Sequence, residues 1–328
     1  MRKPLSATAL VLLACLLAAA PAAANATEME FKVGSECTAN DGVPNATLAP
    51  REGGVNVQRL AVPLEGVLTQ WQVRFAPPEG SGSYPETLKV LRLPRIETYG
   101  ELQVVAESAR ETVVPGPNTF KTRIPVKAGD VFGLWGGATT PTLFCSMAGE
   151  GERMALNTSG ELEVGTVAAF QNGPVETQVP ILATVEADVD GDGYGDVTQD
   201  RCPASALYHG PCPRVSFHAA AHAADRAALV QVSASSAAEI MVAGQVSWRV
   251  RQPGGKVTGL TAGLGAGAKT LAGQGTARFR LPYGKPISRR LGRISPSQSL
   301  KARLTVTVTD LAGRVKTRVL HLRIPGRA

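Results

Sequence analysis

Apolar and polar residues alternate with a period of two in many short stretches of the chain. Such alternation predicts a strand with one buried face. The clearest N-terminal example sets Val67, Trp71, Val73 and Phe75 against Gln70, Gln72 and Arg74. Similar runs, separated by Gly/Pro-rich turns, occur at 88–93, 102–106, 120–126, 131–135 and 179–185. Many short strands between such turns are typical of a β-sandwich or jelly roll. We therefore expect a jelly-roll-like β-sandwich over residues 27–185.

The C-terminal part shows the same pattern more regularly. Two inward sets are expected there: Ile240, Val242, Val246, Trp248 and Val250, and then Leu300, Ala302, Leu304, Val306 and Val308. Residues 309–313 predict a hairpin turn into a strand over 314–324. The glycine-rich stretch 254–275 is expected to be a long connecting loop with a short strand inside it. We predict a second, immunoglobulin-like β-sandwich over residues 214–328. The fold class is then all-β, with two β-sandwich domains.

The first 26 residues have the pattern of a secretory signal peptide. Arg2 and Lys3 precede an apolar run over 7–20, and small residues follow at a cleavage site near Ala26. The apolar run has about 14 residues, whereas a membrane-spanning helix needs roughly 20. Lipidation at Cys15 is a minority alternative, because the apolar run continues past that cysteine. We expect an exported protein without a transmembrane segment, secreted or associated with the cell envelope.

Export changes the expected state of the cysteines. Without Cys15, four remain: Cys37, Cys145, Cys202 and Cys212. An even number in an oxidising compartment predicts two disulfides, although four cysteines allow three pairings. We favour Cys37–Cys145 and Cys202–Cys212, because each bridge then stays within one structural unit. Zinc is the weaker alternative, since no pair has Cys-x-x-Cys spacing.

Charge is distributed unevenly along the chain. The formal net charge is +7, but residues 27–213 hold 13 Lys+Arg and 24 Asp+Glu, whereas residues 214–328 hold 19 and 3. Basic residues recur at spacing two in the second region, and on strands this spacing places each pair on one face. If those strands share a sheet, a cationic surface results that suits an anionic envelope polymer or surface protein. The missing aromatic interleaving argues against nucleic acid. The candidate residues are Arg249, Arg251, Arg278, Arg280, Lys301 and Arg303.

An aspartate-rich segment, residues 186–213, lies between the two expected sandwiches. Calcium binds six to eight oxygen atoms, which a loop can supply from alternate positions. Asp188, Asp190 and Asp192 occupy positions 1, 3 and 5, and Gly193 allows the turn at position 6. Further candidate ligands are the carbonyl oxygen of Tyr194 at position 7, Asp196 at position 9 and Asp200. We predict a calcium-binding joint, closed by the Cys202–Cys212 disulfide.

The sequence of this segment, DVDGDGYGDVTQDRCP, resembles the thrombospondin type 3 repeat, in which aspartate-rich calcium loops adjoin Cys-Pro. The family's late acidic ligand falls where this chain has Gln199, so either Asp200 or Gln199 takes that role. The order of parts is also similar to that of secreted multi-domain proteins of high-GC Gram-positive bacteria. This resemblance implies export and calcium binding, and it implies no specific activity.

No sequence motif predicts catalysis. His218 and His222 have a metal-binding spacing, but their neighbours are alanines and no glutamate is adjacent. We therefore predict no catalytic residue, no organic cofactor and no enzymatic activity. The favoured function is that of an exported, calcium-binding structural or adhesion-type protein of the cell envelope or extracellular matrix. The alternative is a carbohydrate-binding or hydrolytic accessory protein. It would use carboxylates assembled from distant strands, such as Glu97, Glu101, Glu107 and Glu161, or the rings of Tyr84, Tyr99 and Trp135 for stacking on a sugar.

Overall fold

The computed structural model of the chain describes residues 29–51, 60–77, 82–94, 100–146 and 153–326. These residues form twenty-two strands and one helix, so the predicted all-β fold class is confirmed. The expected signal peptide lies outside the described residues. No helix among them combines the length and apolar character needed to cross a bilayer.

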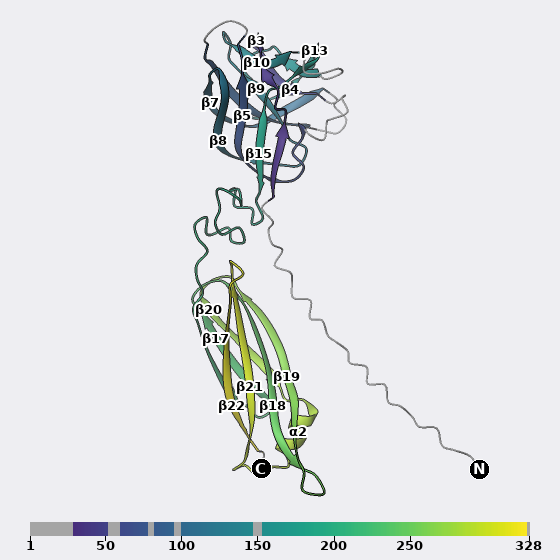
Figure 1. Cartoon of the computed structure of the whole chain (residues 1–328), viewed down its shortest axis with the longest axis vertical. Coiled ribbons are helices and arrows are strands. Elements are labelled where there is room, and N and C mark those ends of the chain that lie inside the picture. Colours follow the sequence, from purple (N-terminus) through teal and green to yellow (C-terminus); the bar gives the residue numbers. More distant parts are fainter. Residues whose placement is uncertain (1–28, 52–59, 78–81, 95–99, 147–152, 327–328) are drawn as a thin grey trace, which may run out of the picture.

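The described residues between 29 and 187 form three sheets, which gather at one end of the molecule (Figure 1). One contains β1 (Glu30–Gly34), β15 (Leu182–Ala187), β5 (Gly66–Phe75), β2 (Thr38–Ala39) and β8 (Gly116–Val126). A seven-stranded sheet contains β12 (Val167–Ala169), β7 (Glu101–Val113), β6 (Tyr84–Arg92), β9 (Val131–Trp135), β4 (Thr47–Pro50), β11 (Arg153–Asn157) and β13 (Gln171–Val175). The third contains β14 (Thr177–Gln178), β10 (Pro141–Ser146) and β3 (Asp41–Pro44).

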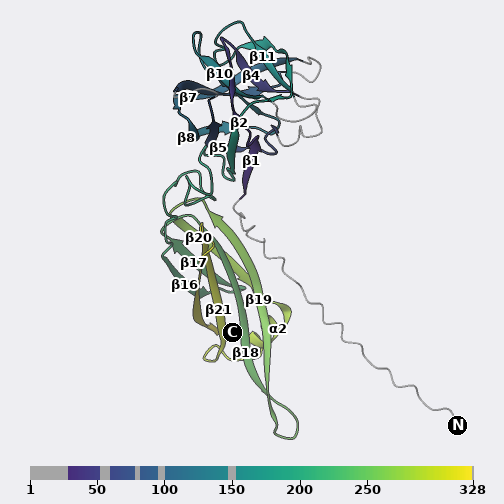
Figure 2. The same cartoon turned by 45° about the horizontal axis from the view of Figure 1, so that its top comes forward.

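Residues 217–325 form two sheets at the other end (Figures 1 and 2). The first contains β16 (Phe217–Ala223), β17 (Ala227–Ala234) and β20 (Gly275–Pro282). The second contains β19 (Val257–Leu271), β18 (Ala238–Arg251), β21 (Ser299–Asp310) and β22 (Val315–Pro325). The helix α2 (Lys285–Leu291) buries Ile287 and Leu291 in the core of this part.

Each part of the chain has its own hydrophobic core. The N-terminal core is built around Trp71, Leu88 and Leu134, which come from both large sheets. The C-terminal core is built around Val230, Ile240 and further residues of the two sheets there, and the two clusters have no member in common. The expected inward phases of β5, β18 and β21 are found, with Trp248 and Val250 only half-buried. The domain boundaries at 185/186 and 213/214 stay a prediction.

The expectation of a loop over 254–275 is wrong. These residues include β19, a fifteen-residue strand that pairs with β18 along nearly its whole length. Glycine weakens an isolated strand, but here it also permits close packing. A Cβ atom at Gly267 would lie 2.9 Å from Cδ1 of the buried Phe279, whereas one at Gly263 would meet nothing within 4 Å. Gly267 therefore lets β19 approach β20, whereas Gly263 plays no part in this contact.

Two disulfides join Cys37 to Cys145 and Cys202 to Cys212, the pairing favoured from the sequence. The first links the start of β2 to β10 within the N-terminal part. The second closes a ten-residue separation in the segment between β15 and β16. Two disulfides indicate an extracellular or otherwise oxidising environment.

The two β19 glycines provide a matched test of this packing. Gly267→Ala should destabilise the protein by about 1–3 kcal/mol, because the added methyl group displaces Phe279. Gly263→Ala should be neutral or stabilising by up to about 1 kcal/mol, since it only restricts the unfolded chain. Urea unfolding of both variants measures the difference. Equal effects would show that β19 does not pack as described.

Candidate metal site

The aspartate loop, which we define as residues 188–200, follows directly on β15. Its turns are made by its own aspartates. Asp188 accepts hydrogen bonds from the backbone amides of Asp192 (3.0 Å) and Gly193 (2.9 Å), and Asp192 accepts one from Tyr194 (2.8 Å). Gly191 and Gly193 have positive φ angles of 73° and 83°, which glycine adopts without strain. The loop therefore curls back so that alternate side chains converge.

Three of the predicted ligands are brought together by this fold. Carboxylate oxygens of Asp188, Asp190 and Asp192 lie within 4.8 Å of one another. Both Oδ atoms of Asp190 are buried without a hydrogen-bond partner, although the amides of Ser205 and Asp192 face this carboxylate without reaching bonding geometry. Oδ1 of Asp196 and Oδ2 of Asp200 are buried and unpartnered as well.

Electrostatics in the loop disfavour several ionised carboxylates at once. Burial raises the pKa of Asp190, and the charge of Asp192 adds to the rise. Burial also raises the pKa of Asp196 to about 6, with smaller contributions from Asp190, Asp188 and Asp200. Raised carboxyl pKa values mean that the ionised groups lack compensating positive charge. Unpartnered carboxylate oxygens are hard ligands, so these residues fit a divalent cation such as calcium.

The two candidates for the late ligand differ in their hydrogen bonds. Nε2 of Gln199 donates a hydrogen bond to the Thr122 carbonyl of β8 (2.8 Å), so this side chain attaches the loop to the N-terminal sheet. Asp200 is 3% exposed and accepts one hydrogen bond, from the Cys202 amide (2.7 Å). Its second oxygen is unpartnered, and the charge of Asp200 is the smallest of the contributions that raise the pKa of Asp196. Asp200 is therefore the better candidate.

A buried glutamate that the sequence analysis did not single out fastens the loop to β15. The Glu186 side chain is fully buried and accepts hydrogen bonds from the backbone amides of Val197 (3.0 Å) and Thr198 (2.8 Å). It also accepts hydrogen bonds from the hydroxyl groups of Thr198 (2.6 Å) and Thr69 (2.9 Å). Nothing in the local sequence distinguishes Glu186 from the aspartates that follow, because its role depends on the distant Thr69.

The ring of Tyr194 provides a second attachment. It is stacked on the His209 ring, with the two ring centroids 3.9 Å apart. The guanidinium group of Arg123, on β8, lies 4.0 Å from the centroid of the Tyr194 ring. Nδ1 of His209 lies 2.6 Å from Oδ2 of Asp192. Arg123, which lies more than sixty positions before the loop in the sequence, thus helps to hold it, and no motif spacing predicts this contact.

The C-terminal part contacts the far end of the aspartate-rich segment 186–213, beyond the loop. Nη2 of Arg314 donates to the carbonyl groups of Cys212 and Pro213, both at 3.1 Å. Nζ of Lys316 donates to the Val215 carbonyl (2.6 Å). Arg314 is itself held by Asp310, at 2.8 Å. The segment is therefore hydrogen-bonded to both β-rich parts of the chain.

The predicted basic residues lie on two different sheets. Arg249 and Arg251 are on β18, and Lys301 and Arg303 are on β21, in the same sheet. Arg278 and Arg280 are on β20, in the other sheet. All six are exposed, but they do not form the single surface that one shared sheet would give.

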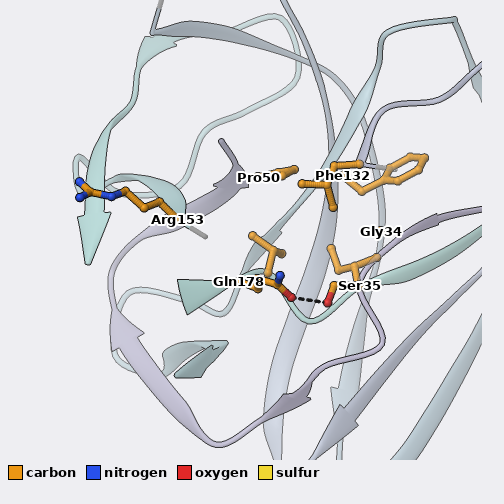
Figure 3. A pocket seen from close by; sticks show the side chains of 9 residues that line it. Gly34, Ser35, Pro50, Phe132, Arg153 and Gln178 are labelled. Atoms are coloured by element: carbon orange, nitrogen blue, oxygen red, sulfur yellow. Dashed lines mark hydrogen bonds between the residues drawn. The ribbon is translucent and has the colours of Figure 1, made fainter. Parts of the chain in front are cut away.

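One small pocket lies in the N-terminal part, and a larger, open one of about 460 Å³ lies in the C-terminal part beside Tyr283, Leu291 and Ile324. Figure 3 shows the small pocket, near β1, where Ser35 donates a hydrogen bond to Gln178. Its volume is about 20 Å³, room for about one water molecule.

Glu107 and Glu161 both contact the buried Lys89 ammonium group, at 2.5 and 3.4 Å. These two carboxylates therefore form ion pairs within the fold.

Comparisons with known proteins add no family. No protein-family model matches the chain, and no curated protein does. Among solved structures, a Bacteroides uniformis β-glucuronidase 2 is similar with 8% identity and a TM-score of 0.15, over 86% of this chain and 26% of that protein. A putative β-galactosidase from Bacteroides fragilis has 9% identity and a TM-score of 0.14, over 89% and 41%. The chain thus spans well under half of either protein, and similarities this weak indicate no function.

Glu186 supplies a direct test of the loop attachment. In Glu186→Gln an amide NH₂ group replaces one of the acceptor oxygens, so a backbone or hydroxyl donor loses its partner. We expect a destabilisation of the loop of roughly 1.5–3 kcal/mol. Hydrogen exchange at the Val197 and Thr198 amides should become faster. The control, Glu30→Gln on the adjacent strand β1, should leave these rates unchanged, and unchanged rates in Glu186→Gln would contradict the described attachment.

Proposed function

We propose that this protein is an exported, calcium-binding structural or adhesion-type protein of the cell envelope or extracellular matrix. Calcium binds the aspartate loop through Asp188, Asp190, Asp192, Asp196 and Asp200, with the Tyr194 carbonyl as a further ligand, and stiffens the joint between the two β-rich parts. The observation that carries the proposal is the group of buried, unpartnered carboxylate oxygens on Asp190, Asp196 and Asp200. The resemblance to the thrombospondin type 3 repeat supports the choice of calcium.

The attachments of the loop explain how one ion can affect both parts. On one side, Glu186 and Gln199 bind the loop to the N-terminal sheet. On the other, Arg314 binds the carbonyl groups that follow the Cys202–Cys212 disulfide. A cation that orders the loop therefore orders the connection between the two parts.

Energy limits the role of calcium to local stiffening. Extracellular calcium modules have Kd values of about 0.1–1 mM. At about 1 mM calcium, binding then stabilises the ordered loop by roughly 0.4–1.4 kcal/mol. Such a contribution is too small to hold a whole domain folded, but it is enough to change how often a short joint opens.

The alternative, a carbohydrate-binding or hydrolytic accessory protein, needs an aromatic cleft in the N-terminal part. Trp71 and Trp135 are buried there, and Tyr84 packs edge-on against Phe75. Tyr99 and Glu97 lie outside the described residues. No described feature favours this second function.

Calcium binding is tested by calorimetric titration. The protein should bind calcium with a Kd in the range of about 0.1–1 mM. Asp190→Asn should weaken binding by about tenfold or more, because Asp190 contributes two buried oxygens and a charge. The control Asp41→Asn, on β3, makes the same chemical change far from the loop and should leave the Kd unchanged. An absence of binding at millimolar calcium would refute the proposal.

Stiffening is tested by limited proteolysis. Arg201 is exposed just after the loop, so trypsin should cut there when the joint opens. About 1 mM calcium should slow this cut roughly two- to tenfold, in proportion to the occupied fraction. Asp190→Asn, digested in the same calcium concentration, should lose the protection, which excludes an effect of calcium on trypsin. A cut rate independent of calcium in a protein that binds the ion would contradict the stiffening role alone.

A further inference from the structure

Six basic side chains share the outer face of the four-stranded C-terminal sheet. We call this set the cationic face: Arg249, Arg251, Lys301, Arg303, His321 and Arg323. They come from β18, β21 and β22, and all are exposed. They occupy the end of the sheet near α2 and the C-terminus, away from the aspartate loop (Figure 1). His321 and Arg323 join the set only through the strand register, which the sequence did not reveal.

Strand register brings these side chains into direct opposition. Lys301 pairs with Arg323, and Arg303 pairs with His321, across β21 and β22. Arg249 and Arg251 continue the same face on β18, where Ser247 is the partner of Lys301. Directly opposite residues have Cβ atoms about 4.5–5.5 Å apart, and like charges placed so are destabilising. The fold thus concentrates positive charge at a cost in stability.

No acidic residue of the described C-terminal part neutralises this face. Residues 214–328 contain three acids. Asp310 binds Arg314 near the joint, and Asp225 lies 3.7 Å from Arg226 in the turn between β16 and β17. Glu239 is at the opposite end of β18 from Arg249, about 33 Å away at the rise of a strand. Counter-charge for this face can therefore come from another molecule.

The chemistry of the face favours phosphate groups carried on a polymer. Four of its six members are arginines, whose guanidinium groups bind phosphate oxygens in pairs. Successive members of one strand are about 6.7 Å apart, so several repeating charges of one chain can be bound together. Trp248 has the inward phase and packs against the core, and the residues that precede Arg249 on the same face of β18 are the polar Gln245 and Ser247. The face thus supplies no Trp, Tyr or Phe ring on which a base can stack, and His321 is its one imidazole.

We propose that the cationic face binds a phosphodiester polymer without aromatic bases, such as a polyol-phosphate chain of a cell envelope. The proposal takes the envelope setting from the function proposed above, but the binding itself does not involve the aspartate loop. The proposal names a class of ligand for the adhesion-type role, and it places the binding surface on one sheet only.

The opposite sheet offers a matched control. Arg278 and Arg280 are exposed on β20 at the same spacing of two. The double variant K301E/R303E and the double variant R278E/R280E change the net charge equally. Binding of fluorescent poly(glycerol phosphate) to the full mature chain is measured at low salt in EDTA, so that calcium binding plays no part. We expect K301E/R303E to weaken binding about tenfold or more, with a flatter salt dependence, and R278E/R280E to weaken it less than about threefold.

Other results would overturn the proposal. Equal losses of affinity in the two double variants would show that only net charge matters. An unmodified chain that does not bind the polymer would refute the proposed binding surface. Tighter binding of single-stranded DNA, with the same dependence on Lys301 and Arg303, would assign the face to nucleic acid instead. Thermal unfolding checks that each variant is folded, and K301Q/R303Q, which removes charge without reversing it, should give an intermediate loss.

Discussion

Repulsion among the carboxylates of the aspartate loop is the constraint around which the joint is arranged. Backbone amides within the loop satisfy Asp188 and one oxygen of Asp192, and they leave oxygens of Asp190, Asp196 and Asp200 without partners. A fold that buries unpaired carboxylates is unstable unless something fastens them in place. Glu186, Gln199 and the stacked Tyr194 hold the loop in place, and a bound cation would supply the positive charge that these contacts lack.

How far the sequence predicted the structure depends on whether the determinants were local. The inward phases of β5 and β21 and the Asp-x-Asp-x-Asp-Gly turn depend on residues a few positions apart, so alternation and spacing revealed them. β19 was missed because glycine-rich segments lack an apolar pattern, and its stability comes from pairing with β18. Glu186 was missed because its partner Thr69 is 117 positions away.

The assignment of strands to sheets also depends on contacts between residues far apart in the sequence. Spacing of two correctly indicated that Arg249 and Arg251, or Arg278 and Arg280, share a face. It could not indicate which strands are neighbours, because pairing in an antiparallel sheet is decided by contacts across the whole domain. Topology assigns β20 to one sheet and β18 and β21 to the other, and it adds Arg323 opposite Lys301. The expected surface of six residues therefore becomes two faces, of which one is denser in positive charge than the pattern implied.

The loop and the cationic face account for part of the uneven charge along the chain. The loop holds five of the 24 acidic residues of positions 27–213, and the face holds five of the 19 Lys and Arg residues of positions 214–328. Negative charge is concentrated at the joint, where Arg314 and Lys316 of the C-terminal part donate hydrogen bonds to backbone carbonyl groups rather than to the loop aspartates. Positive charge is concentrated at the far end of the four-stranded sheet. Attraction between them is screened over about 10 Å at ordinary ionic strength, and the length of β18 exceeds that distance several-fold. The two charged regions are therefore electrostatically independent, so the cation proposed for the loop and the polyanion proposed for the cationic face can each bind without the other.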